Sequence, residues 1–551
     1  MRRFWAGCWV MVLVGLMGWA GFVWGEEAEE RLEARIFFTE GAGGPLRESA
    51  EFQTEEDPHA FLWITGLRPR PQDHGRASIA GMLSAYKPDG TLLTESPFSA
   101  DKYMELLGPG AEVIYLQTNV NGNDYSSGPH KIVAEVVHNE TGKRVTASRE
   151  FFIKPVEKLS IIQYEFGYRS DKSISPGMFL QAGRPHVLNL QLLKFGLKDG
   201  QARLRISMMG CDQQGQPIQA EPMVQERQLT AEIEEGHYLI GKLSLPFVPN
   251  RAGQHFIRVT VDDLNSGEKT TRDIPCPVVS VFGDAEQAVP TPPPGLLWLE
   301  ACLTNGEHGS LRQGNTYYAN DTIYSQIRIA GLKTNAHGIG KLALRVTVSD
   351  ETGQLLFEKE VEELPYHLMH DRNVFEFSFW QKTNFPETLS GPVTWTLQIT
   401  DQISGATGYL SKEVVVNPDT QLHATGYEFY LWEDSDIPAG NLFTVGRPYH
   451  LRATVVGTEL KNSTRDIEVK MIGVDRQGNR LSDFELSTSQ PIAFSRFSEP
   501  AKNLDIKLPF RLNRSGKYAL RLIVTDKHSG QVTSEDIPIE VVGLGPNDLK
   551  E

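Results

Sequence analysis

Cysteine is the scarcest of the chemically informative residues in this 551-residue chain. There are four, and one of them, Cys8, falls in an apolar stretch near the N-terminus. The other three, Cys211, Cys276 and Cys302, lie far apart, which excludes a zinc site built from closely spaced cysteine pairs. Also missing are a phosphate-cradling glycine loop and a serine–histidine–acid arrangement. We therefore expect neither an enzyme nor a bound cofactor.

Basic side chains are outnumbered. The chain has 54 lysines and arginines against 70 aspartates and glutamates, which gives a formal net charge of -16. A field of that sign repels phosphate backbones and anionic lipid surfaces. Nucleic acid is therefore not an expected partner, and contact with a membrane is expected only through the N-terminal segment.

Long hydrophobic runs are absent except for one, residues 4–24, which follows Arg2 and Arg3 and precedes the acidic stretch 26–30. This order is typical of an export signal. We expect residues 1–25 to be a cleaved signal peptide or, because the run is long enough to span a bilayer, an uncleaved membrane anchor. The two arginines hold the N-terminus inside in either case, so the predicted location of the body is periplasmic, cell-surface or secreted.

What the sequence does have is an internal repeat. Subtracting 263 from a residue number in the second half usually gives its counterpart in the first. Matching triplets are YEF at 164–166 and 427–429, GRP at 183–185 and 446–448, and DIP at 273–275 and 536–538. Over residues 243–279, 17 of 37 positions are identical in the second copy, far above chance. Both copies must then share one fold.

Each repeat is two domains long. We divide the chain into domains A1 (32–156), B1 (157–284), A2 (296–419) and B2 (420–543), with a linker at 285–295. The linker carries VPTPPPG at 289–295, and such a proline run favours a semi-rigid extended spacer. We expect A and B to touch within each half and the two halves to swing relative to each other.

Strand patterns dominate the four domains. FEFSF at 375–379 and LALRVTV at 342–348 alternate apolar and polar residues, the period of a half-buried strand. Every domain closes with a hairpin whose turn ends in glycine, at 139–142, 263–267, 401–405 and 526–530. Short strands at regular spacing predict an all-β fold of four tandem β-sandwich domains in the order A-B-A-B.

The closing element of the domains consists of a glycine, an aromatic or apolar strand, a turn and a last strand; the turn is Asp-x-x-Ser-Gly in B1, A2 and B2, and A1 has Asn139 to Gly142 there instead. The closing element resembles bacterial immunoglobulin-like surface domains, most clearly at GKY, residues 516–518. The resemblance covers a short part of each domain and implies an immunoglobulin-like architecture but no activity.

The duplication provides a test for each candidate site, because a proposed functional residue in one copy can be compared with its counterpart in the other. Asp263, Asp401 and Asp526 open the closing hairpins, where one carboxylate would accept hydrogen bonds from turn amides. Calcium is the alternative, although it needs several oxygen ligands close together. No tryptophan repeats in register between the copies, which favours packing over a sugar-stacking platform.

Histidines and cysteines fail the same test. His367 and His370 correspond to Met104 and Leu107, so we interpret the cluster at 367–371 as a solvated loop and not as a metal site. Cys211 and Cys276 have a sandwich-like separation, but the second copy has valine and isoleucine there. We interpret them as small buried residues, with a disulfide as the alternative.

The charged residues that both copies share are the candidate site. Arginines and an aspartate of B1 recur in B2: Arg184, Arg258 and Asp273 correspond to Arg447, Arg521 and Asp536. A structural ion pair between the last two strands, such as Arg521 with Asp536, is the favoured interpretation. The alternative is an anion-binding patch repeated in both halves, and a repeated binding surface is expected there first.

These observations favour an exported, non-catalytic multi-domain protein that acts in adhesion, scaffolding or protein–protein docking at the cell envelope. Its expected partner is a protein or a cell-surface polymer, and repeated modules would add avidity when two sites engage one partner. An array of carbohydrate- or ligand-binding modules is the alternative, and calcium-dependent adhesion is a third possibility.

Overall fold

The computed structural model describes residues 31–542 apart from 41–45, 48, 55, 57, 68–76, 101–105, 108–111, 115–126, 170–173, 177–179, 231–240, 283–288, 307–308, 310, 313, 319–320, 372, 383–388, 419–420, 432–438, 440–441, 483–484 and 494–503. The regular elements of this part of the chain are β-strands, and it contains no helix. Accordingly, no helix in it could cross a membrane. The predicted export segment, 1–25, lies outside the described residues.

The two A domains are built alike, each from a three-stranded and a five-stranded sheet. In A1 the strands are β1 (Glu33–Thr39), β2 (Glu51–Gln53), β3 (His59–Thr65), β4 (Ile79–Tyr86), β5 (Leu92–Ala100), β6 (Glu112–Ile114), β7 (Gly128–His138) and β8 (Arg144–Lys154). In A2 they are β18 (Trp298–Thr304), β19 (Thr316–Tyr318), β20 (Thr322–Ala330), β21 (Ile339–Asp350), β22 (Leu355–His367), β23 (Val374–Lys382), β24 (Gly391–Asp401) and β25 (Thr407–Asn417).

The B domains repeat this plan, and B1 adds one short strand, β10. In B1 the strands are β9 (Ser160–Arg169), β10 (Ile174–Pro176), β11 (Leu180–Gln181), β12 (His186–Leu193), β13 (Gln201–Cys211), β14 (Met223–Thr230), β15 (Gly241–Phe247), β16 (Gly253–Asp263) and β17 (Lys269–Val279). In B2 they are β26 (His423–Leu431), β27 (Leu442–Thr444), β28 (Pro448–Val456), β29 (Thr464–Val474), β30 (Leu486–Ala493), β31 (Leu504–Arg511), β32 (Gly516–Asp526) and β33 (Val532–Val542).

All four sandwiches share one topology. The smaller sheet of A1 has the order β1-β3-β6 and the larger one β2-β8-β7-β4-β5. The other three domains give the same orders when their strands are counted from the first and the extra strand β10 of B1 is left out. One short strand, β2, β11, β19 or β27, pairs parallel to the last strand of its domain, whereas the other pairings of the larger sheets are antiparallel. The chain thus consists of four tandem immunoglobulin-like β-sandwich domains, and the predicted fold class is confirmed.

The alternating patterns in the sequence become the inner and outer faces of these sheets. In β24, for example, Val393, Trp395, Leu397 and Ile399 are buried and the residues between them are partly exposed. Four clusters of buried apolar side chains correspond to the four sandwiches. Because side chains on a strand alternate between its faces, one period-two sequence fills a core and also covers it with polar groups.

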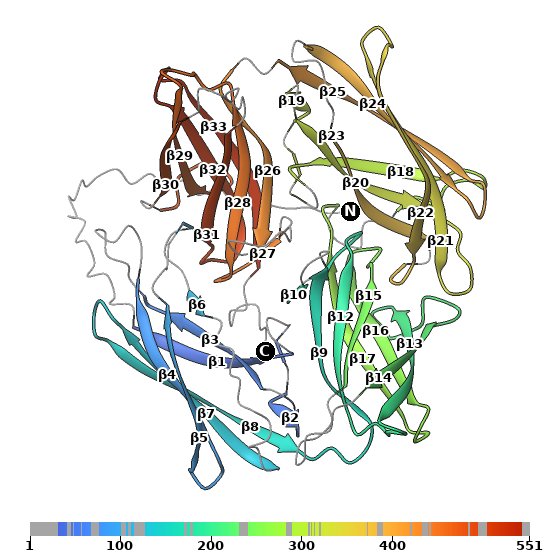
Figure 1. Ribbon diagram of the computed structural model, residues 1–551, viewed down its shortest axis with the longest axis vertical. Coiled ribbons are helices and arrows are strands. Elements are labelled where there is room, and N and C mark those ends of the chain that lie inside the picture. Colours follow the sequence, from blue (N-terminus) through green and yellow to red (C-terminus); the bar gives the residue numbers. More distant parts are fainter. Residues whose placement is uncertain are drawn as a thin grey trace, which may run out of the picture.

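The four sandwiches form a ring (Figure 1). The chain runs from A1 (blue) through B1 (green) and A2 (yellow) to B2 (orange and red), and the last sandwich returns to lie beside the first. The backbone N–H of Leu107 in A1 donates to Oδ1 of Asn513 in B2 at 3.2 Å, although 406 positions separate them in the sequence. We call the contact between B2 and A1 the closing junction, and the contact between B1 and A2 the linker junction.

The linker junction contradicts one expectation. The two halves were expected to swing about the proline-rich linker, but B1 and A2 are joined by several hydrogen bonds. Gln326 Nε2 donates to the carbonyl oxygen of Ala182 at 3.2 Å, and the N–H of Glu376 donates to the carbonyl oxygen of Asn250 at 3.2 Å. The prediction failed because a linker's composition gives its stiffness and says nothing about contacts beside it.

Candidate functional site

The repeated arginine–aspartate pairs lie on the last two strands of the B sandwiches. Arg258 on β16 and Asp273 on β17 are cross-strand partners, and the guanidinium Nε and Nη2 donate to the two carboxylate oxygens at 2.7 and 2.8 Å. Arg521 and Asp536 repeat this geometry in B2 at 2.6 and 2.8 Å. The hydrogen bonds to aspartate raise the pKa of both arginines.

Each of these arginines also lies against the glycine of a neighbouring hairpin turn. Arg258 Nη2 lies 3.4 Å from the carbonyl oxygen of Gly215, and the corresponding Gly478 lies under Arg521. Both aspartate oxygens are occupied by the guanidinium, so an incoming anion would have to displace a carboxylate. This geometry supports a structural pair that ties two strands and a hairpin together.

Arg184 and Arg447 lie apart from these pairs. They occupy the turns before β12 and β28, where their exposed fractions are only 4% and 9%. Arg447 of B2 faces Glu165 of B1: burial raises the pKa of Glu165 to about 7, and the nearby guanidinium works against that rise. The six predicted residues therefore form two ion pairs and two separate arginines, and not one continuous patch.

The hairpin aspartates hold backbone amides. Asp263 accepts from the N–H groups of Asn265 at 2.9 Å and Gly196 at 2.5 Å, and so connects its own turn to a second loop. Asp401 and Asp526 make the corresponding contacts with the N–H groups of residues 333 and 459. In the described part of the chain, no group of three or more histidine, cysteine, aspartate or glutamate side chains is placed to hold a metal ion.

The interpretation of residues 367–371 as a solvated loop is wrong. His370 is 3% exposed and lies between A2 and B1, with its ring centroid 4.7 Å from that of His255. Its Nε2 lies 3.5 Å from Sγ of Cys276. Burial lowers the pKa of His370 well below its ordinary value, and the neighbouring His255 and His367 lower it further.

Cys276 and Cys211 are both buried, and both are free thiols. Burial raises the pKa of Cys276 well above its usual value, which keeps the thiol protonated and unreactive. The favoured interpretation, that of small buried residues, agrees with this placement.

Asn250 is the centre of the linker junction. It is fully buried, and its Oδ1 accepts from the N–H groups of Met369 at 2.8 Å and His370 at 2.6 Å. Its Nδ2 donates to the carbonyl oxygens of Val374 at 2.7 Å and Asp371 at 3.0 Å. One side chain of B1 therefore satisfies four backbone groups of A2.

Ion pairs surround this asparagine. Arg251 of B1 pairs with Asp371 of A2. Arg328 Nε donates to Oε1 of Glu376 at 2.9 Å, and Ser280 of B1 donates to the same carboxylate. The linker junction is thus predominantly polar.

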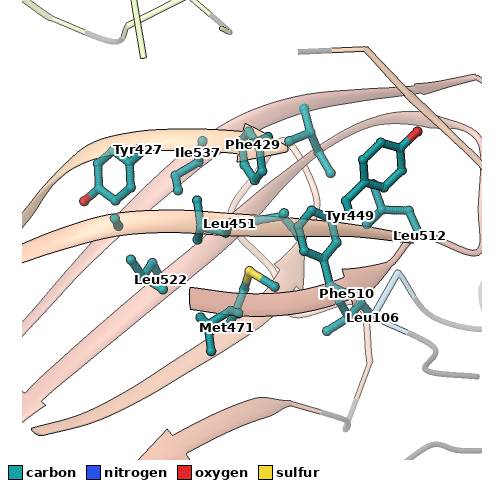
Figure 2. Close-up of a cluster of buried hydrophobic side chains, with 14 of the residues drawn as sticks. Leu106, Tyr427, Phe429, Tyr449, Leu451, Met471, Phe510, Leu512, Leu522 and Ile537 are labelled. Carbon is teal, nitrogen blue, oxygen red and sulfur yellow. The ribbon is translucent and has the colours of Figure 1, made fainter. Parts of the chain in front are cut away.

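The closing junction is apolar instead. Phe61, Trp63, Leu106 and Leu107 of A1 belong to the buried cluster of B2, and Figure 2 shows Leu106 among side chains of that cluster such as Phe510 and Met471. The positions of A2 that correspond to Phe61, Trp63 and Leu107 hold Gln326, Arg328 and His370. The same part of the A fold is therefore apolar at the closing junction, where no linker joins the two domains, and polar at the linker junction.

Two further pairs of residues were missed by sequence reasoning. Gly210 and Gly473 lie where a partner backbone approaches: an added Cβ would stand 1.7 Å from the carbonyl oxygen of Met369 and 2.1 Å from that of Leu106. Asn250 and Asn513 occupy equivalent places in the two junctions. The signal was available, since both pairs are identical between the copies.

A cavity of about 510 Å³ lies beside the linker junction. Its walls come from the proline run of the linker, from 330–333 of A2, and from the Arg251–Asp371 pair. Arg251 and Asp371 neutralise each other at this wall, and Lys333 is a further cationic side chain in the lining.

A scan against protein-family models finds no match, and a search of curated proteins finds none either. Solved structures that match include trypsin-activated alpha-2-macroglobulin from Escherichia coli, at 10% identity over 93% of this chain and 42% of that one, with a TM-score of 0.16. Salmonella alpha-2-macroglobulin reacted with methylamine matches at 10% identity over 93% and 40%, also with a TM-score of 0.16. The chain thus spans about two fifths of the length of these proteins.

The C-terminal domain of the AgI/II polypeptide BspA from Streptococcus agalactiae matches at 11% identity, over 44% of this chain and all of that domain, with a TM-score of 0.16. Similarities of this size assign no activity to this chain. The class of protein that the structure defines is a multi-domain β protein with repeated sandwiches.

Proposed function

We propose that this chain is an exported, non-catalytic protein that acts as a scaffold or docking platform at the cell envelope, with a protein or a cell-surface polymer as its partner. One observation carries the proposal: the polar residues shared by the two halves are used for strand pairing, turn formation and domain junctions. Arg258 with Asp273 and the fully buried Asn250 are examples. Groups of this kind stabilise the arrangement of strands and domains, which is what a scaffold requires.

The outer edges of the ring are the surfaces that a partner would meet. The larger sheets end in the long strands β5, β14, β22 and β30. Three of these strands contain a proline, which removes a backbone N–H and blunts an edge against further pairing, whereas β14 contains none. Its residue Val224 is 53% exposed. We place the first docking contact at this edge of B1, where an extended segment of a partner can add as a strand.

The test is a cross-linking pull-down from the native envelope with the full chain carrying a photoreactive group at position 224. The matched control carries the same group at Leu92 of β5, an edge that contains a proline and whose side chain is 45% exposed. A partner that recurs at position 224 and not at position 92 supports the proposal. A catalytic turnover that one point substitution abolishes would contradict it, as would the absence of any recurrent partner.

Two simpler measurements test the alternative functions, carbohydrate binding and calcium-dependent adhesion. A carbohydrate-binding array would give reproducible hits on a glycan array. Calcium-dependent adhesion would show as a higher melting temperature with calcium than with a chelator, because a bound ion stabilises the folded state by mass action.

A further inference from the structure

The closing junction is a contact between the two ends of the chain, and nothing covalent holds it. A1 presents one surface and B2 a different one, so the contact is heterologous. In such a contact, the surface of A1 in one molecule is complementary to B2 of every other copy.

We propose that this A1 surface, formed by Phe61, Trp63, Leu106 and Leu107, is a docking site for the B2 sandwich of a second copy of the chain. In the closed ring, the molecule's own B2 occupies the site. When the ring opens, B2 of another copy takes its place and the two chains form a domain-exchanged assembly.

The chemistry of the junction supports a stable contact of this kind. The A1 residues join the apolar core of B2, and Leu106 and Leu107 are 1% and 0% exposed in the ring. Opening exposes this apolar surface to water, which favours reoccupation. Apolar interfaces that resemble a divided core are typical of permanent complexes.

The two junctions also specify which surfaces pair. B2 meets leucine at position 107, whereas B1 meets His370 at the corresponding place and carries His255 and Cys276 against it. Docking B1 on A1 would leave these polar groups facing apolar side chains, and buried groups without partners oppose binding. The surface of A1 therefore selects B2, in its own chain or in another.

Ring opening needs a pivot, and the linker junction is suited to that role. The four sandwiches stay on one chain after the closing junction separates, because the linker keeps B1 and A2 connected. In the closed ring, the intramolecular contact has a high effective concentration, so exchange is expected only when closure is weakened or when the protein is concentrated.

The test uses two full-length variants, each with one damaged surface. Gly473→Leu damages B2, because any side chain there meets the carbonyl of Leu106, and leaves A1 intact. Leu107→Arg damages A1 and leaves B2 intact. Circular dichroism verifies folding, small-angle scattering verifies ring opening, and light scattering after gel filtration gives the mass.

Each variant alone is expected to be an opened monomer, and an equimolar mixture is expected to yield a complex with the mass of two chains. A chain carrying both substitutions is the control and should not associate with either single variant. Should Gly473→Leu fail to fold, Gly473→Ala replaces it, because a Cβ alone already stands 2.1 Å from the carbonyl oxygen of Leu106. Rings that stay closed in both variants, or folded and opened variants that give no complex on mixing, would overturn the proposal.

Discussion

Arg328 and Glu376 form an ion pair across β20 and β23, with 2.9 Å between Nε and Oε1 and exposed fractions of only 4% and 0%. At the corresponding positions of A1, Trp63 and Val113 pair across β3 and β6. One fold thus carries a charged pair at the linker junction, where the corresponding residues of A1 are tryptophan and valine. A buried ion pair offsets the loss of hydration only when both partners are present.

Removing one partner of this pair should therefore be far more damaging than replacing both. Glu376→Val leaves the buried Arg328 with only Glu300, 3.6 Å away and 42% exposed, and should lower the free energy of unfolding by up to about 3–5 kcal/mol. Adding Arg328→Trp reproduces the residues of A1 and should recover most of the loss. Urea unfolding of the two single variants and the double variant measures the coupling. A double variant as unstable as the sum of the single variants would show that the two positions are independent.

Asn250 leads to a second prediction. Asn250→Ala deprives two N–H groups and two carbonyl groups of A2 of their partner, and each buried polar group left unpaired costs about 1–3 kcal/mol. We expect a loss of several kcal/mol, together with faster amide exchange at Met369 and His370, whose N–H groups it holds. The matched variant is Asn513→Ala in the closing junction, where the amide expected to exchange faster is that of Leu107 instead. Unchanged exchange at 369 and 370 in Asn250→Ala, or the same change there in Asn513→Ala, would contradict this role.

The fold was predictable because it depends on local signals. Alternating residues, such as those of LALRVTV at 342–348, have one buried face in any sandwich, and the glycine-ended turns determine where hairpins close. The cross-strand pair of Arg521 with Asp536 was predictable for the same reason, since the closing hairpin sets its register.

The junctions were not predictable, because they depend on which domains meet. The residues around His370 have the composition of a surface loop, and His370 is buried only because B1 packs against it. Comparison with the first copy misled as well: Leu107 at the corresponding position suggested that the histidine had no role, whereas both residues are junction residues in different surroundings. Identity between the copies at Asn250 and Asn513 was the better signal.

Acid should weaken the ring at its buried histidines. Burial lowers the pKa of His59 and of His367 to about 4, and it lowers that of His370 well below its usual value. Since an unfolded histidine has a pKa near 6.5, the unfolded chain binds more protons than the folded one below that value. The histidines therefore impose no penalty above about pH 6.5, and stability should fall steadily from there to about pH 4.

His370→Leu separates this effect from general acid denaturation. The variant places at the linker junction the residue that the closing junction has, Leu107, and removes one protonation site. The groups that face His370 are His255, Cys276 and His367, so part of the pH dependence should remain. Melting temperatures between pH 7.5 and pH 4 should decline less steeply in the variant than in the wild type. His528→Leu, at a hairpin turn in B2 away from the linker junction, is the control substitution.

The exposed arginine–aspartate pairs should contribute little to stability. The side chains of Arg258 and Asp273 are 35% and 42% exposed. An ion pair this accessible to solvent contributes less than about 1 kcal/mol to the free energy of unfolding. Asp273→Ala and Asp536→Ala should each lower the free energy of unfolding by that amount or less, and the loss should be smaller in high salt. Urea unfolding at low and high salt measures both.

The same substitutions also test the anion-patch alternative, because removing the carboxylate leaves the guanidinium open to an added anion. Sulfate should raise the melting temperature of the alanine variants more than that of the wild type if the aspartate normally fills the place of an anion. A wild-type protein that sulfate stabilises at least as strongly as the variants would show that the arginines bind anions without displacing their partners, and would restore the patch as a binding site.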